Sequence, residues 1–209
     1  MACHWGGRAV VPARVVRNWD LEPRPVCQAA LQQLRITAHR PIINLEKINP
    51  RLFSLVQELG LVKRLRTELI GMKKYLTVCR KATEDHVLWK HVDAPHLIDS
   101  LDMYSLQDLV DTNSGELPFK LHSLVEIFSN HIKVDCEICK GRAHICVICL
   151  CNEVVYPFDT TGHTCSNCNS VMHKVCYNRK NQCPKCLRIK SRMEEEQNNN
   201  QKENEEGTD

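Results

Sequence analysis

Most of the cysteines in this 209-residue chain are gathered in one segment with regular spacing. Of thirteen cysteines, ten fall between positions 136 and 186. Five ligand pairs share an x-x spacing: Cys136 with Cys139, Cys146 with Cys149, Cys165 with Cys168, His173 with Cys176, and Cys183 with Cys186. Two residues separated by two can form a tight knuckle, so that both side chains reach one metal ion at about 2.3 Å. The spacing therefore predicts structural zinc sites, each closed by two pairs.

Other uses of paired cysteines fit the sequence less well. The first twenty residues contain no apolar core typical of a secretory signal, so we expect a reducing compartment and no disulfides. A single C-x-x-C motif is compatible with a redox site, but five such pairs favour metal. Zinc with four protein ligands leaves no open position for a substrate, so the sequence predicts no enzyme activity.

The order of the pairs suggests how they are grouped. The last four pairs follow the order of a cross-braced finger of the PHD or RING kind. Cross-bracing places Cys146, Cys149, His173 and Cys176 on one ion and Cys165, Cys168, Cys183 and Cys186 on another. The first pair, Cys136 and Cys139, then lacks partners, and the nearby candidates are His131, His144, Cys151 and His163. The number of zinc ions, two or more, stays open at this point, and Cys27 and Cys79 are expected to be core thiols.

A helical region precedes the cysteine-rich segment. Helices are predicted over about 26–38, from Pro50 onward with Asn49 as the N-cap, over 106–111 after Ser105, and over 118–132. Apolar residues from Leu52 to Leu76 recur every three or four positions, which indicates a packing face. A loop is expected between the last two helices.

The predicted fold class is a mainly α N-terminal region continuous with a small zinc-stabilised α+β finger module. The predicted divisions are an irregular segment over 1–25, a helical part over 26–133, a multi-zinc module over 134–192 and a disordered acidic tail over 193–209. Within the module, residues 153–158 are expected to pair with 170–175 in a hairpin. Tyr156, Phe158 and Met172 are predicted to form its small core.

Charge places weak limits on the partners. The net charge is +3, and residues 194–209 carry seven acidic groups and one lysine, so the rest of the chain is moderately basic. The basic residues between positions 185 and 192 are expected to form a solvated helix face, and nucleic-acid binding is not predicted. No apolar run approaches the 18 residues that a membrane span requires.

Several segments together resemble the Rubicon-homology domain, which is found in Rubicon, Pacer and the PLEKHM adaptors. The resemblance lies in "NWDLEP", "INLEKINPRLFSLVQEL", "MYSLQDL", "NHIKVDCEICKGRAHICVIC" and the cysteine pattern that ends in "CPKC". It covers roughly residues 10–190, and the first two segments are most similar to the FDCP-eight branch of that family. The family pattern of nine cysteines and one histidine maps onto the five pairs above, and Cys151 falls outside it.

The sequence also departs from the family at two points. Family members usually carry a glycine and an aromatic residue before the third cysteine, where this chain has Arg142, Ala143 and His144. Members also normally carry a further N-terminal region, so we expect this chain to be a fragment or a short isoform.

The resemblance implies a non-enzymatic adaptor that binds a late-endosomal Rab GTPase and acts in lysosome positioning, endosome maturation or autophagy. It also implies a cytoplasmic protein that is recruited to late endosomes and lysosomes, with other trafficking adaptors as further partners. Two alternatives remain open from the residues alone: a RING-type ubiquitin ligase and a phosphoinositide-binding zinc finger.

Overall fold

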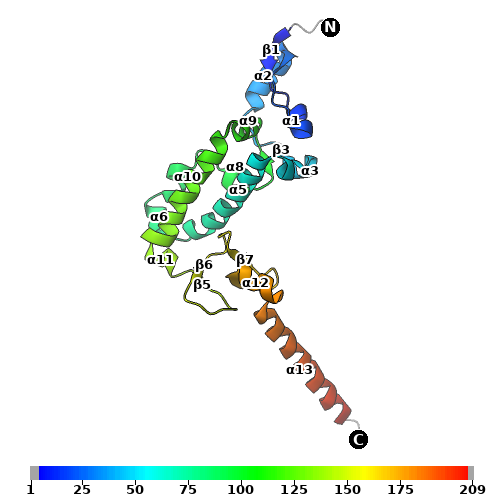
Figure 1. The fold of residues 1–209 in the computed structure, drawn as a ribbon, viewed down its shortest axis with the longest axis vertical. Coiled ribbons are helices and arrows are strands. Elements are labelled where there is room, and N and C mark those ends of the chain that lie inside the picture. Colours follow the sequence, from blue (N-terminus) through cyan, green and yellow to red (C-terminus); the bar gives the residue numbers. More distant parts are fainter. Residues whose placement is uncertain (1–4, 207–209) are drawn as a thin grey trace. The chain divides into compact units, whose positions relative to one another are not determined.

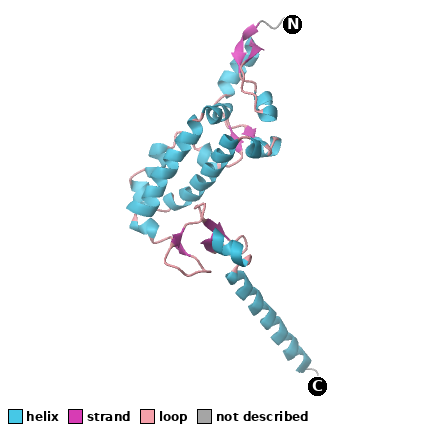
Figure 2. Ribbon diagram, viewed as in Figure 1, coloured by secondary structure: helices cyan, strands magenta, loops and turns pink. Residues whose placement is uncertain are grey.

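The chain folds into two compact units. The computed structural model describes the backbone of residues 5–206 and the side chains of residues 6–197. Its units are Met1–Cys139 and Lys140–Asp209, called here the helical unit and the cysteine-rich unit. Helices make up most of the first unit, and short strands join them in the second (Figure 2). The sequence predicted one continuous body with a boundary at 133, whereas the division falls after Cys139.

The N-terminal segment is ordered rather than irregular. Its elements are β1 (Trp5–Ala9), α1 (Pro12–Asn18), β2 (Arg24–Cys27) and α2 (Gln28–Thr37). β1 pairs antiparallel with β2, and Pro12 occupies the start of α1, where its missing N–H costs nothing. The prediction for residues 1–25 is therefore wrong over 5–25, because strand pairing between distant segments leaves little signal in local composition.

The predicted apolar stripe forms the centre of the helical unit. The structure divides the expected long helix into α4 (Leu52–Leu55) and α5 (Gln57–Leu76), after a short α3 (Leu45–Ile48). The break lies at Val56, whose backbone is extended. Gly60 permits the close approach of the two helices, since a Cβ there would lie 2.9 Å from the carbonyl oxygen of Phe53.

Asn49 was expected to cap that helix, and this prediction is wrong. Its amide Nδ2 donates instead to the carbonyl oxygens of Val16 at 3.0 Å and Arg17 at 3.3 Å. The residue therefore ties α1 to the segment between α3 and α4, a long-range contact that local capping rules do not predict.

Short elements connect α5 to the last two long helices of the unit. They are α6 (Arg80–Glu84), α7 (Val87–His91), α8 (His96–Asp99) and the two-residue strand β4 (Met103–Tyr104). β4 pairs antiparallel with β3 (Ile43–Asn44), which lies before α3. Arg66 of α5 is fully buried and donates to the carbonyl oxygens of Leu97, His96, Ser100 and Met103. Its guanidinium carbon also lies 4.3 Å from the ring centre of Tyr104.

Two consecutive long helices follow these short elements. Ser105 caps α9 (Leu106–Ser114) through a capping box with Asp108, as the sequence predicted for the cap. The loop expected before the next helix shrinks to Gly115, whose φ of 83° suits a residue without Cβ. α10 (Glu116–Asn130) follows and packs along α5 (Figure 1). The facing apolar residues are buried: Leu59, Val62, Leu65, Leu69 and Met72 on α5, and Leu117, Leu121, Leu124 and Phe128 on α10.

The cysteine-rich unit is built from two small ribbons and two helices. Its elements are β5 (His144–Ile145), β6 (Val154–Val155), β7 (Gly162–Thr164), β8 (Val171–His173), α12 (Lys174–Lys180) and α13 (Pro184–Glu206). β5 pairs with β6 and β7 with β8, so the predicted pairing of 153–158 with 170–175 is wrong. The predicted burial of Tyr156, Phe158 and Met172 is confirmed, and the first two rings stack at 5.2 Å. Met172 belongs to a cluster with Cys146, Cys165 and Cys183, so a single core of all three predicted residues stays a prediction.

The C-terminal segment continues α13 as far as Glu206. Disorder was predicted for 193–209. The structure does not describe the side chains of residues 198–209 or the placement of 207–209, so this stays a prediction. Over the described residues, no helix combines the length and the apolar character that crossing a bilayer requires.

Candidate metal centres

Four buried side chains from three parts of the helical unit converge in one place. Cys79 precedes α6, His131 follows α10, and Cys136 and Cys139 lie around the start of α11 (Glu137–Lys140). Their ligand atoms all lie within 4.8 Å of one another, and we call this cluster site 1.

A π-helical turn, His131–Asp135, positions two of these ligands. It follows α10 directly, and the backbone N–H of Cys136 donates to the carbonyl oxygen of His131 at 3.0 Å. This wider turn places both His131 and Ile132 in the interior. Single-turn π-helical segments are rare in proteins and are frequently found at functional sites.

The distances within site 1 suit a tetrahedral ion. The Sγ of Cys79 lies 3.5 Å from His131 Nε2 and 3.6 Å from Cys136 Sγ. Zn–S bonds of about 2.3 Å at tetrahedral angles place two sulfurs about 3.8 Å apart, far beyond the S–S bond of about 2.05 Å. The side chains are at most 6% exposed. This cluster is therefore a closed set of three thiols and one imidazole that can hold a metal ion.

The interior of site 1 affects how its groups ionise. Burial, followed by the nearby thiols of Cys79 and Cys136, raises the pKa of Cys139 to about 12. Burial and the charge of Lys81 lower the pKa of His131, which favours the neutral imidazole that binds metals. A divalent cation would offset the cost of holding several thiolates in this apolar place.

Site 2 lies in the cysteine-rich unit and consists of Cys146, Cys149, His173 and Cys176. The Nδ1 of His173 lies 3.4 Å from Cys149 Sγ and 3.9 Å from Cys176 Sγ. His173 ends β8 and Cys176 lies on α12, so one strand–helix junction supplies half of the ligands.

Backbone groups prepare the first thiol of site 2 for metal binding. Burial alone would raise the pKa of Cys146, but N–H groups of Cys149, His173 and Ile148 lower it to about 6. The N–H of His173 lies 3.4 Å from this sulfur. In contrast, the backbone N–H of Cys151 lowers the pKa of Cys149, but the surrounding thiols raise it to about 12.

The other ring nitrogen of His173 faces Glu153. Its Nε2 lies 3.9 Å from Glu153 Oε2 and is buried without a hydrogen-bond partner. A carboxylate on the outer nitrogen of a metal-binding histidine fixes the tautomer that leaves the inner nitrogen free to bind. Glu153 stands in the position for that role.

Site 3 consists of Cys165, Cys168, Cys183 and Cys186. The sulfurs of Cys165 and Cys186 lie 3.6 Å apart, and those of Cys168 and Cys183 lie 3.5 Å apart. The hydroxyl and backbone N–H of Ser170 lower the pKa of Cys168 to about 6. Hydrogen bonds with the neighbouring thiols raise the pKa of Cys186 to about 12.

Sites 2 and 3 share one small core. Met172 is fully buried in a cluster with Cys146, Cys165 and Cys183, which come from both sites. The ligand pairs alternate along the chain, first site 2, then site 3, then site 2, then site 3. This is the cross-braced arrangement that the pair order indicated.

The structure also brings two further side chains to the first cysteine pair. His131 was among the four sequence candidates, and it joins Cys136 and Cys139 in site 1. Of the other candidates, His144 is exposed on β5, His163 stacks on Tyr177 at 3.8 Å, and Cys151 lies 3.3 Å from Cys149.

Cys79 was the residue that sequence reasoning missed, since it was expected to be only a core thiol. Its side chain is 1% exposed, but it also completes site 1. One signal was available, because Cys136 and Cys139 supply only two of the four ligands that a tetrahedral site needs. The missing two had to be other cysteines or histidines, but the distance of Cys79 along the sequence concealed it.

Comparisons with known proteins agree with the cysteine pattern. A sequence model of the Rubicon Homology Domain matches residues 1–191. The chain is 42% identical over 192 residues to a Drosophila melanogaster protein named "Differentially expressed in FDCP 8 homolog", covering 91% of this chain and 39% of that protein. It is 36% identical over 199 residues to the Caenorhabditis elegans protein of the same name, covering 92% of this chain and 41% of that protein.

The chain thus spans about two fifths of the length of these curated relatives. The family match, in contrast, extends through the helical unit and all three cysteine sites. On this evidence the chain belongs to the Rubicon Homology Domain family.

Proposed function

We propose that this chain is a zinc-stabilised adaptor domain that binds a small GTPase of the Rab class on late endosomes and lysosomes, without catalysing a reaction. One observation carries the proposal: the family match covers a fold whose three cysteine sites are each closed by four ligands. Closed sites support structure, whereas catalytic zinc keeps a position for water or substrate.

The donor set supports zinc over other metals. The twelve side chains of sites 1, 2 and 3 are all thiols and imidazoles. Glu153 belongs to a further group with Cys151 and His173, but its carboxylate is exposed and lies outside the three sites. Sets of four soft or borderline ligands at tetrahedral spacing favour zinc, while calcium and magnesium prefer oxygen. The ten ligands predicted from the sequence, together with Cys79 and His131, are our proposed zinc ligands.

The GTPase part of the proposal has support at the level of the family. Domains of this family bind small GTPases, and we extend this property to the present chain. Regulation of lysosome positioning, endosome maturation or autophagy would then follow from recruitment by a membrane-bound GTPase.

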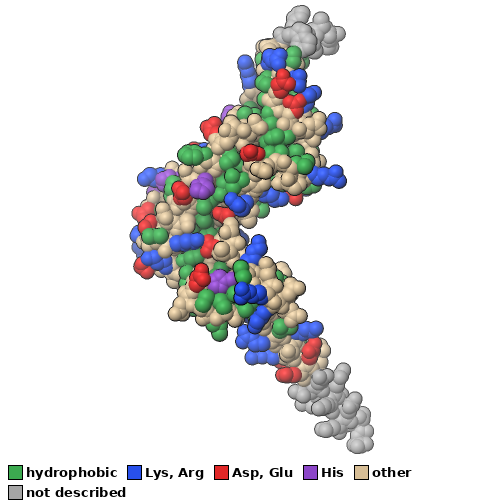
Figure 3. All heavy atoms as spheres, in the orientation of Figure 1, with side chains coloured by type: hydrophobic (Ala, Val, Ile, Leu, Met, Phe, Trp, Pro, Cys, Tyr) green, Lys and Arg blue, Asp and Glu red, His purple; other side chains and the backbone are tan. Residues whose placement is uncertain are grey.

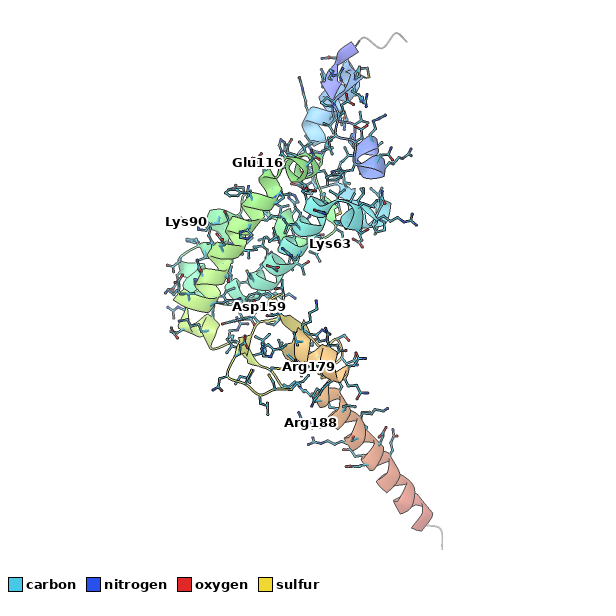
Figure 4. All side chains as sticks on the ribbon, viewed as in Figure 1. Lys63, Lys90, Glu116, Asp159, Arg179 and Arg188 are labelled. Atoms are coloured by element: carbon cyan, nitrogen blue, oxygen red, sulfur yellow. The ribbon has the colours of Figure 1, made fainter. Side chains whose placement is uncertain are left out.

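Exposed aromatic residues of the helical unit mark a candidate contact surface. Trp89 on α7 is 57% exposed and Phe119 on α10 is 76% exposed. The two helices pack together, and Lys120 next to Phe119 pairs with Asp93 at 3.0 Å just beyond α7. Figure 4 marks this region by Lys90 on α7 and Glu116 at the start of α10. Aromatic residues are enriched among the side chains that dominate binding at interfaces.

A nucleotide-dependent pull-down tests the proposal. The chain is expected to bind late-endosomal Rab proteins loaded with a GTP analogue and to bind the GDP forms weakly. Phe119→Ala and Trp89→Ala are each expected to weaken binding about tenfold, as loss of an interface anchor does. Leu55→Ala on α4, which truncates a side chain that is 74% exposed, serves as the matched control.

Two results would count against this assignment. Equal binding to both nucleotide states would remove the effector role. A loss of binding in the Leu55→Ala control as large as in the two aromatic variants would remove the assigned surface while leaving the GTPase role intact.

The cross-braced arrangement of sites 2 and 3 favours a ubiquitin ligase of RING type as the second candidate. An auto-ubiquitination assay with a panel of E2 enzymes separates the two functions. Ubiquitinated product that disappears when the site 3 cysteines are replaced would support the ligase. Absence of ubiquitinated product from a chain that still binds the GTPase would support the adaptor.

A further inference from the structure

One face of α13 combines positive charge with exposed apolar side chains. Lys185, Arg188, Ile189 and Arg192 follow the i, i+3, i+4, i+7 spacing of a single helix face. They line a shallow hollow of about 240 Å³. Met193 lies one turn beyond Ile189, and these two apolar side chains are 55% and 44% exposed. We call these five residues the basic face.

The chain on the N-terminal side of this face is also positively charged, whereas three exposed glutamates, Glu194, Glu195 and Glu196, follow it on α13. From Lys174 to Met193 the chain carries seven lysines and arginines and no acidic residue. All seven cations are exposed. Figure 3 shows blue side chains gathered over α12 and the first half of α13, and Figure 4 labels one on each helix, Arg179 and Arg188. The cysteine-rich unit up to Met193 has nine basic residues and only two acidic ones, Glu153 and Asp159.

The cations of the basic face are not neutralised by the chain itself. Among the described residues, Lys190 pairs with Glu194 at 3.8 Å, but Lys190 lies outside the basic face. No ion pair within the described part of the chain involves Lys185, Arg188 or Arg192. Three adjacent cations without counter-charges repel one another, and an external anionic surface would remove that cost.

The combination of residues indicates what kind of surface this is. Nucleic-acid grooves add aromatic side chains on which bases stack, and the basic face contains none. A bilayer with anionic lipids accepts both features present here, since cations meet headgroups and apolar side chains enter the boundary with the acyl chains.

We propose that the basic face of α13 binds the surface of anionic phospholipid membranes. The helix lies along the surface, with Lys185, Arg188 and Arg192 at the headgroups and Ile189 and Met193 below them. Recognition depends on the density of negative charge and not on one headgroup. The GTPase proposal does not depend on this site, which lies in the other unit of the chain.

Sedimentation of the zinc-loaded chain with vesicles tests the proposal. Binding to vesicles of phosphatidylcholine with phosphatidylserine is expected, with little binding to phosphatidylcholine alone and a marked loss as salt is raised. Replacing Lys185, Arg188 and Arg192 together with glutamine is expected to weaken binding roughly 100-fold, given the contribution of each cation near a charged surface.

A matched control removes the same charge elsewhere. Lys47, Arg51 and Lys74 are exposed cations of the helical unit, and their triple glutamine variant is expected to bind vesicles as the parent does. Equal losses in both triple variants would overturn the proposal, because net charge alone would then explain binding. Metal content and circular dichroism of both variants verify that they are folded.

Two further measurements distinguish related surfaces. Ile189→Ser with Met193→Ser retains every charge and is expected to weaken vesicle binding about tenfold through lost insertion. Vesicles with a phosphoinositide, matched in total charge, are expected to bind no more tightly than those with phosphatidylserine. A strong phosphoinositide preference that the triple variant abolishes would contradict charge-based binding and indicate a specific headgroup pocket.

Discussion

At the scale of single residues, buried polar side chains join segments of the helical unit that the apolar stripe of α5 does not connect. Cys79 and Arg66 both lie in the helical unit and are 1% and 0% exposed. The thiol completes site 1, and the guanidinium donates to the carbonyl oxygens of Leu97 in α8 and Met103 in β4. Each residue therefore joins segments that are distant along the chain, so truncating it removes more than its own packing.

Cys79→Ser is expected to remove one of the three zinc ions that we propose. A serine hydroxyl is a poor replacement for a thiolate, and the three remaining ligands would then face an open position. Native mass spectrometry should report two ions per chain, and thermal unfolding should occur at a lower temperature. Cys27→Ser, outside the three sites, is the control, and unchanged zinc content in Cys79→Ser would exclude this residue as a ligand.

Arg66→Leu is expected to destabilise the helical unit by about 3 kcal/mol, because it leaves several buried carbonyl groups without donors. Arg64→Leu on the same helix is expected to cost less than about 0.5 kcal/mol. That side chain is 62% exposed and only weakly paired with Glu68, at 3.9 Å. Urea unfolding monitored by far-ultraviolet circular dichroism measures both values, and similar losses in the two variants would contradict the role of Arg66.

At the scale of elements, caps and turns set where the helices of the helical unit begin and end. Ser105 starts α9, and the Asp108 carboxylate both closes the capping box and bonds His96 of α8 at 2.8 Å. Burial alone would raise the pKa of Asp108, but the hydrogen bonds from His96 and Ser105 hold that pKa below its usual value. The start of α9 is thus tied to an ionised carboxylate.

The hydrogen-bonded Asp108 carboxylate predicts that the stability of the helical unit depends on pH. A carboxyl group whose pKa is lower in the folded state stabilises the fold above its unfolded pKa of about 3.9, and that stabilisation is lost as pH falls through the lowered value. Asp108→Asn should therefore be less stable than the parent at neutral pH, with the difference shrinking below about pH 4. Unfolding curves across this range provide the test, and a constant difference at all pH values would contradict it.

Sequence patterns predicted the elements with local signals and missed those with distant partners. The apolar stripe on α5 and the cap at Ser105 were correct, since both depend on spacing within one segment. The β1–β2 ribbon and the contact of Asn49 with Val16 were missed, because each joins segments that carry no signal of one another. The β7–β8 hairpin was missed although its strands lie close in sequence, because residues 153–158 are richer in β-forming side chains than the true partner, Gly162–Thr164. The same holds for the metal sites: Cys165 and Cys168 were predicted from their local spacing, whereas Cys79, which lies far from its partners in the sequence, was missed.

At the scale of the whole molecule, the three sites differ in how they depend on the chain around them. Site 1 lies within a helical unit that has a large apolar core of its own, whereas sites 2 and 3 alternate along one short segment and share Met172. Structural zinc in small finger domains provides about 10–16 kcal/mol of binding free energy. With zinc in sites 2 and 3, as proposed, the cysteine-rich unit would depend on both ions together.

Cys183→Ser is expected to reduce the zinc content from three ions to one. Loss of site 3 removes part of the core on which site 2 rests, so the second ion should leave with the first, while site 1 persists. Native mass spectrometry counts the ions, and limited proteolysis should cut between 140 and 190. A variant that keeps two ions would show that sites 2 and 3 fold independently.

The distance along the sequence between Cys79 and Cys136 determines which pieces of this protein can be studied. The ion proposed for site 1 would act as a crosslink over 57 residues, and closing a loop of that length would restrict the unfolded chain considerably. A fragment trimmed at the end of α10 would keep every long helix of the helical unit and still lose this link. Recombinant versions of the helical unit should therefore extend through Cys139, and a newly synthesised chain cannot complete the link before that residue has left the ribosome.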